Sequence, residues 1–157
     1  MKIFVGSDHA GFELKEKLIP FLISLGFEVI DMGAKEYQEG DDYPDYVFLV
    51  AREVAMRPNE VKGIILGGSG QGEAMCANRL KNVRATVYYG DGNKSIGGDE
   101  SIIRLSREHN NANILSLGAR FITEDEMMKA VNEWLEVSFS GEERHVRRIN
   151  KMDHFHE

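Results

Sequence analysis

The sequence has few features that would cross-link the chain or hold it in a membrane. Cys76 is the only cysteine, so no disulfide can form within one chain. No apolar run reaches the length that spans a bilayer, and the first residues lack the apolar core of a signal peptide. Repeats, low-complexity tracts and linker-like segments are also absent. We therefore expect a single cytoplasmic domain over residues 1–157, a length that can bury a core without cross-links.

Positive charge is also scarce. The chain has 26 acidic and 19 basic residues, which gives a formal net charge of -7. Binding to nucleic acid or to an anionic membrane needs a basic surface, so the composition argues against both and favours a small molecule or a protein as the partner. Basic residues concentrate only in the segment 138–157, which has no clean helical period. We expect this segment to be a basic C-terminal tail.

Short apolar runs alternate with segments of helical period along the chain. The runs that predict strands lie at 2–6, 27–31, 61–66, 83–89 and 113–117. Cap and turn signals support the helices between them: Gly26 as a C-cap, Pro44 in a first turn, Asp99 or Ser101 as an N-cap, and Thr123 with Glu126 as a capping box. Because most strands are apolar on both faces, the sequence predicts an α/β protein. Its fold is three-layered and Rossmann-like, with a five-stranded parallel sheet and helices on both faces.

A glycine-rich turn at 67–72 follows the third predicted strand and precedes a short helix. Its four glycines allow backbone N–H groups to approach a ligand closely, and the start of the helix adds unpaired donors, so the turn predicts an anion site. Ser69 and Glu73 are its polar side chains. A glycine-rich connection without a ligand is the simpler alternative.

Known nucleotide-binding loops do not fit this turn. A dinucleotide fingerprint would need glycine where Glu73 stands, and a nucleoside-triphosphate loop would need lysine there. A carboxylate beside a turn rich in N–H groups suits removal of a proton next to a carbonyl, because the turn can hold the enediolate oxygen that forms. The residues therefore suggest an isomerisation.

Ligands of parallel sheets bind at the carboxyl ends of the strands. In this sequence those ends offer Asp8 with His9, the segment 41–43, the glycine turn with Glu73, a polar loop at 90–99, and Arg120.

Seven motifs extend this picture over nearly the whole chain. They are GSDHAG at 6–11, DYP at 42–44, GGSGQGE at 67–73, AN at 77–78, REHN at 107–110, LGAR at 117–120 and RHVRR at 144–148. In order and spacing the chain resembles the ribose-5-phosphate isomerase B family, which also includes galactose-6-phosphate isomerase subunits. The resemblance implies interconversion of an aldose phosphate and a ketose phosphate through an enediolate, with no metal or organic cofactor.

The resemblance also implies catalytic roles. Many members use a cysteine two positions before the serine of the turn as the base, but that position here is Gly67. The sequence resembles the branch in which the glutamate at the end of the turn is the base, which is Glu73. Ser69 would assist at the sugar hydroxyls, and His109 would open the furanose ring.

Other matched positions would bind the substrate. Asp8 and Asn110 would hold sugar hydroxyls, and backbone groups of the turn would hold the oxyanion. The full set implied for substrate binding is His9, Tyr43, Gly68, Gly70, Gly72, Asn110, Arg120, Arg144 and Arg148, with His9, Arg144 and Arg148 on the phosphate. Family members are dimers or dimers of dimers with sites shared between subunits, so a homodimer is implied, and the tail 138–157 would contribute to the site or the dimer.

Simpler structural interpretations exist for several of these residues. Glu73 could favour the positive end of its helix, His109 could interact with the carbonyls at a helix end, and the basic run could be solvated. Two other functions also stay open: isomerisation of a six-carbon phosphate such as galactose 6-phosphate or allose 6-phosphate, and sugar-phosphate binding by an inactive regulatory protein. The loop 90–99 could alter sugar preference or be a tolerated insertion.

Overall fold

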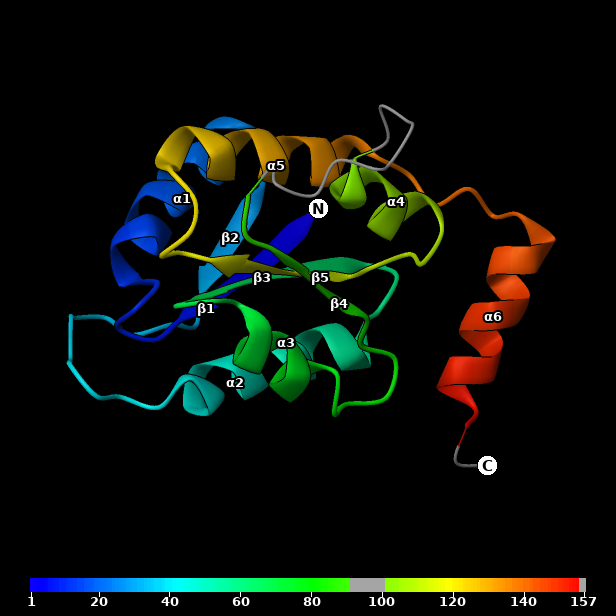
Figure 1. Cartoon of the computed structure of the whole chain (residues 1–157), viewed down its shortest axis with the longest axis horizontal. Helices are drawn as coiled ribbons and strands as arrows, with labels where there is room; N and C mark the ends of the chain where they lie inside the picture. The colour runs from blue at the N-terminus through cyan, green and yellow to red at the C-terminus, as the bar shows by residue number, and fades with distance from the viewer. Residues whose placement is uncertain (91–100, 156–157) are drawn as a thin grey trace.

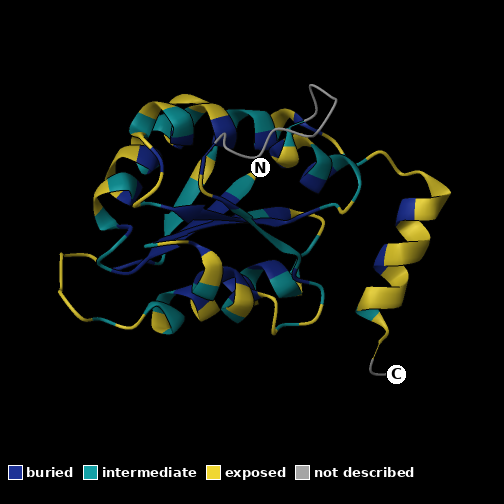
Figure 2. Ribbon diagram, in the orientation of Figure 1, coloured by how far each residue is buried: buried dark blue, intermediate teal, exposed yellow. Residues whose placement is uncertain are grey.

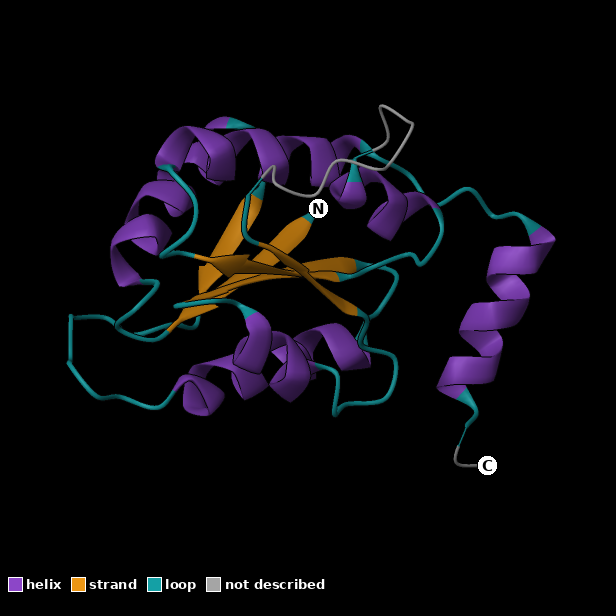
Figure 3. Ribbon diagram, viewed as in Figure 1, coloured by secondary structure: helices purple, strands orange, loops and turns teal. Residues whose placement is uncertain are grey.

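A computed structural model describes residues 1–90 and 101–155. Within these residues, parallel strands form one sheet in the order β2-β1-β3-β5-β4, and helices cover both faces (Figures 1 and 3). The strands are β1 (Lys2–Ser7), β2 (Glu28–Asp31), β3 (Val61–Gly67), β4 (Ala85–Tyr88) and β5 (Ile114–Gly118). The helices are α1 (Phe12–Ser24), α2 (Tyr43–Met56), α3 (Gln71–Ala77), α4 (Ile102–Glu108), α5 (Glu124–Glu136) and α6 (Glu143–Asp153). The predicted three-layer fold is confirmed.

The sheet is buried on both faces, which explains why its strands read as continuous apolar runs. In β3, Ile64, Ile65 and Leu66 are all fully buried. Ile64 and Leu66 join a core formed with α1, α4 and α5, whereas Ile65 joins a second core formed with α2 and α3. Figure 1 shows these two helical layers above and below the sheet.

Local sequence signals set several helix ends as predicted. The Ser101 hydroxyl accepts a hydrogen bond from the Arg104 backbone N–H at the start of α4. Thr123 and Glu126 form a capping box at the start of α5. Gly26 follows α1 with a φ of +86°, a conformation that glycine adopts at little cost. Asp99 and the rest of the predicted 90–99 loop after Gly90 lie outside the described residues.

The basic segment 138–157, in which the sequence shows no clean helical period, contains the helix α6. Only His145 and Ile149 are buried on it, one helical turn apart, and most of its surface is exposed (Figure 2). A buried stripe that consists of one histidine and one isoleucine is a weak periodic signal, which explains why the sequence shows no clean helical period here. The helix stands apart from the three layers (Figure 1). No helix in the described ranges has the length and apolarity needed to cross a membrane.

Candidate active site

The carboxyl ends of β1, β3 and β5 bring the first group of predicted site residues together. Ala119 and Arg120, after β5, donate backbone N–H groups to the carbonyls of Gly67 and Gly68 at 2.8 and 3.1 Å. The Arg120 guanidinium lies over Gly68, where a Cβ atom would be 3.4 Å from it. Tyr43, at the start of α2, lies over Gly72, where a Cβ atom would come within 2.8 Å of the phenol oxygen. The turn is therefore enclosed by the substrate-binding candidates predicted around it.

The glycine turn needs glycine at residue 70 for its backbone conformation. Gly70 has a φ of +76° and precedes the first residue of α3. Its carbonyl accepts a hydrogen bond of 2.6 Å from the buried Ser116 hydroxyl on β5, and a side chain at residue 70 would lie 3.1 Å from the Gly118 nitrogen. The Ser69 side chain, by contrast, belongs to an exposed residue at the tip of the turn. The turn is thus fixed from behind and offers Ser69 and its backbone to a ligand.

Glu73 lies beneath this turn and is 4 % exposed. Its carboxyl group fills the space beside Gly67, so a Cβ atom at residue 67 would overlap the Glu73 carboxyl oxygen. Burial raises the pKa of Glu73, and the negative charge of nearby Asp8 raises it further. Hydrogen bonds from the backbone of Glu73 itself and of Gly70 oppose this increase but do not reverse it. A carboxylate with a raised pKa binds a proton more strongly than an exposed carboxylate does, which suits a general base.

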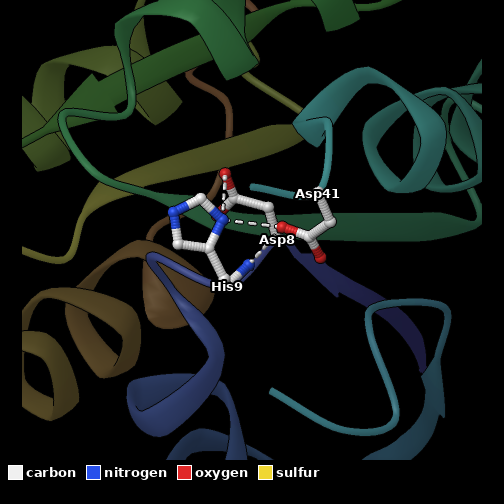
Figure 4. A group of neighbouring side chains, drawn as sticks. All are labelled: Asp8, His9 and Asp41. Atoms are coloured by element: carbon white, nitrogen blue, oxygen red, sulfur yellow. Dashed lines mark hydrogen bonds and ion pairs between the residues drawn. The ribbon is translucent and has the colours of Figure 1, made fainter. Parts of the chain in front are cut away.

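Asp8, His9 and Asp41 form a cluster beside the turn (Figure 4). One Asp8 oxygen accepts hydrogen bonds from the backbone of Ala10 at 3.0 Å and of Gly11 at 3.4 Å. Burial raises the pKa of Asp8 despite these bonds. The three side chains offer ligand atoms within 4.8 Å of one another, close enough to hold a metal ion. The Oδ1 atoms of Asp8 and Asp41 each already accept two hydrogen bonds, whereas the buried Asp41 Oδ2 atom has no hydrogen-bond partner among the described residues. The expectation of a cofactor-free site stays a prediction.

The second group of predicted site residues lies at the opposite edge of the sheet. His109 ends α4 and Asn110 follows it, before the amino end of β5. Arg144 and Arg148 are exposed on α6, where Arg144 also pairs with Glu142 at 2.8 Å. The Glu73 carboxyl lies at Gly67, which pairs with Gly118 at the carboxyl end of β5, whereas His109 and Asn110 precede this strand. Within one chain, they are therefore separated from Glu73 by about the length of β5, roughly 16 Å for five residues.

His109 and α6 are linked by a pair of histidine rings. The His145 ring, 1 % exposed, lies with its centroid 4.3 Å from that of His109, and its Nδ1 is 3.0 Å from the Ser140 hydroxyl. Burial lowers the pKa of His145 and His109 lowers it further, which keeps His145 neutral at neutral pH. The contact fixes the start of α6, and with it Arg144 and Arg148, beside His109.

Comparison with known proteins identifies the family. The sequence profile of the Ribose/Galactose Isomerase family matches residues 3–152. The chain belongs to this family. Among similar solved structures, ribose-5-phosphate isomerase B from Mycoplasma genitalium, with bound ribulose-5-phosphate, is 37 % identical, has a TM-score of 0.89, and aligns over 98 % of this chain and 95 % of its own. That from Clostridium thermocellum is 38 % identical with a TM-score of 0.87, over 99 % and 97 % of the two chains. The ribose-5-phosphate isomerase B of Mycolicibacterium paratuberculosis is 37 % identical over 96 % of this chain and 88 % of its own.

Two residues of this ribose/galactose isomerase contact predicted site residues although the sequence assigned neither a role. Asp41 was placed only within the segment 41–43 at the carboxyl ends of the strands. Asp41 binds His9 across 32 residues of sequence, and His145 packs on His109 from another helix. Asp41 stands next to the DYP motif and His145 lies within RHVRR, so their motifs pointed to the right regions. Their contacts depend on tertiary structure, which neither motif specifies.

Proposed function

We propose that this family member interconverts ribose 5-phosphate and ribulose 5-phosphate, with Glu73 as the base. The observation that carries the proposal is the buried Glu73 carboxyl, with its raised pKa, in the space beside Gly67 and beneath a turn that presents backbone N–H groups. The relatives named ribose-5-phosphate isomerase B support this choice of substrate.

The proposed chemistry moves one hydrogen between two carbon atoms. The Glu73 carboxylate removes the proton from C2 of the open-chain aldose, and the electron pair of that bond forms the C1–C2 double bond of an enediolate. Backbone N–H groups of Gly68, Gly70 and Gly72 stabilise the negative oxygen. The Ser69 hydroxyl passes a proton between the two oxygens, and Glu73 returns its proton to C1. The net change transfers hydrogen from C2 to C1 and from O2 to O1.

The remaining residues of the proposed site bind the phosphate and open the sugar ring. His9 and Arg120, which lie close enough to influence each other's charge, would bind the phosphate together with Arg144 and Arg148. His109 would open the furanose ring, since an imidazole can donate and accept protons near neutral pH.

We infer that a complete site needs two copies of the chain. Glu73 with its neighbours lies at the carboxyl edge of the sheet, and His109 with Arg144 and Arg148 at the amino edge. A two-fold dimer that places the amino edge of each chain against the carboxyl edge of its partner would complete two equivalent sites. The position of α6 away from the layers (Figure 1), and a cavity of about 580 Å³ that Asn110 and Asp153 help to line, leave room for a partner.

A panel of substrates tests the proposed function. We expect kcat/KM for ribose 5-phosphate to exceed that for allose 6-phosphate and galactose 6-phosphate by at least about 10-fold, because a site shaped for five carbons must displace a wall to admit a sixth. Initial rates of ketose formation measure this. A preference for a six-carbon substrate would assign the chain to hexose phosphates. Tight binding of ribose 5-phosphate without exchange of its C2 proton into deuterated solvent would instead indicate an inactive binder.

Replacing Gly67 with alanine should displace the base. The added methyl group overlaps the end of the Glu73 side chain and not the backbone, so the chain can fold with the carboxyl moved aside. We expect kcat to fall about 10²-fold, the effect of an approximately 1 Å misplacement of a catalytic group, with KM within a few-fold of the wild-type value. Steady-state kinetics and thermal unfolding measure the two effects. Unchanged kcat would contradict the placement of Glu73, and a large drop in the unfolding midpoint would attribute the loss to misfolding.

A further inference from the structure

We propose that Asp41 is a positioning residue that holds His9 in one orientation and in its positively charged form, so that the His9 Nε2–H group can bind the substrate phosphate. The proposal rests on the proposed function, which supplies the phosphate. None of the sequence motifs assigns a role to Asp41.

Asp41 holds His9 at two points with one oxygen. Its Oδ1 atom accepts a hydrogen bond of 2.9 Å from the His9 backbone N–H and lies 2.7 Å from the His9 ring Nδ1 (Figure 4). With both the main chain and the ring fixed to the same oxygen, the ring has little freedom to rotate. Tyr37 packs edge-on against the ring, at a centroid distance of 6.1 Å and an angle of 89°. The ring atom Nε2 is left to face away from Asp41.

Burial makes this contact effective. The Asp41 side chain is 6 % exposed, whereas the His9 side chain is 22 % exposed. Asp41 is therefore shielded from solvent on the inside of the pair, and the exposed part of His9 is available to a ligand. When the Nδ1–H group donates to Asp41, Nε2 carries a hydrogen only if the ring is protonated. His9 can therefore donate from Nε2 to a phosphate oxygen only in its positively charged form.

The charges around His9 favour the imidazolium. The hydrogen bond to Asp41 raises the pKa of His9, and Asp8, with an oxygen 3.9 Å from Nδ1, adds to the increase. Burial and, to a smaller extent, Arg120 oppose the increase but do not reverse it. Burial alone would raise the pKa of Asp41, yet the hydrogen bonds from the His9 backbone and ring, the interaction with the Tyr46 hydroxyl and the charge of His9 together outweigh burial and lower it. Among the described residues the charged groups that act on His9 are thus two carboxylates and one guanidinium, and together they favour its positively charged form.

The consequence is a phosphate contact whose strength depends on pH. A protonated His9 offers the phosphate both a hydrogen bond from Nε2–H and a full positive charge, whereas a neutral ring that donates its one N–H to Asp41 offers the phosphate neither. Without Asp41 the pKa of His9 should fall, so that a larger fraction of the rings is neutral at pH 7.5. A decrease of one pKa unit lowers the charged fraction by up to about tenfold.

The test is the variant Asp41→Asn, which keeps the shape of the side chain and removes its charge. We expect the pKa of His9, measured by NMR titration of its ring protons in the ligand-free protein, to fall in this variant. We also expect KM for ribose 5-phosphate at pH 7.5 to rise about tenfold while kcat changes less, and the rise of KM with pH to begin at a lower pH. Asp45→Asn is the matched control, because Asp45 is an exposed carboxylate four residues further along the chain.

A variant of His9 tests whether Asp41 acts through this histidine. His9→Gln should remove the pH dependence that His9 confers on KM, and Asp41→Asn should then add little to it, since Asp41 acts through His9. An unchanged pKa of His9 in Asp41→Asn, or KM profiles that match those of Asp45→Asn, would overturn the proposal. Failure of the wild-type protein to turn over ribose 5-phosphate would refute the proposed function instead, and the NMR titration would still decide whether Asp41 controls the charge of His9.

Discussion

Replacement of Glu73 by glutamine should lower kcat for ribose 5-phosphate by about 10²–10⁴-fold, the usual contribution of a general base. Glutamine has nearly the same shape as glutamate and fits the space beside Gly67, but its amide cannot accept the proton from C2. Since the substrate contacts of the site are kept, KM should stay within a few-fold of the wild-type value. Initial-rate kinetics and the exchange of the C2 proton into deuterated solvent measure the loss directly.

The same substitution should stabilise the folded protein at neutral pH. Burial raises the pKa of Glu73 in the folded state, so the folded protein favours the protonated carboxyl. The Glu73 carboxyl makes its full contribution to the free energy of unfolding at pH values below its unfolded-state pKa of about 4.3. This contribution is lost as the pH rises through the higher pKa of the folded state. A neutral glutamine avoids that loss. Thermal unfolding at pH 7.5 should therefore show a higher midpoint for Glu73→Gln than for the wild-type protein, and the difference should disappear near pH 4.

An inactive variant with raised stability distinguishes a catalytic role from a structural one. Glu60→Gln, a change at an exposed position before β3, is the matched control and should alter neither kcat nor the midpoint. If Glu73→Gln kept near-normal kcat, the proton transfer would belong to another group, and Asp8, the carboxylate that influences the pKa of Glu73, would be tested next. If the variant lost both activity and stability, Glu73 would be a structural residue.

The sequence predicted what depends on local patterns. Apolar runs located the strands, Thr123 with Glu126 located the start of α5, and the glycines of the turn marked the close backbone approach around residue 70. These features depend on hydrogen bonds and conformations within a few residues of sequence. The residues gathered at the carboxyl edge could also be predicted, because parallel strands all end there.

The remaining features depend on contacts between distant segments. The bond between Asp41 and His9 requires the loop after β2 to fold over the end of β1, and nothing in either segment specifies this. The helix α6 buries two side chains, one of them the polar His145, so its period was too weak to detect. The separation of His109 from Glu73 follows from strand direction. It became visible only once the order of strands was known.

Because His109 and Glu73 lie at opposite edges of the sheet in one chain, we expect two defective variants to restore activity to each other. Glu73→Gln alters the carboxyl-edge group. The double variant Arg144→Ala/Arg148→Ala alters the amino-edge group at exposed positions of α6, where folding should be unaffected. We expect kcat/KM of the double variant to fall by at least about 10²-fold, since each arginine would lose charge-assisted hydrogen bonds to the phosphate.

Co-expression of the two variants with different tags should recover activity if sites are shared between subunits. In a mixed dimer, the Glu73 edge of the arginine variant faces the intact arginines of the Glu73→Gln chain, which rebuilds one wild-type site, and the other site carries both defects. With random pairing, half of the dimers are mixed and each has one working site of two, so the total should reach about a quarter of the wild-type activity. Glu73→Gln co-expressed with Gly67→Ala is the control: both changes affect the same edge, and no intact site can form. Activity no higher than that of the control would mean that one chain completes its own site, and would refute the shared site.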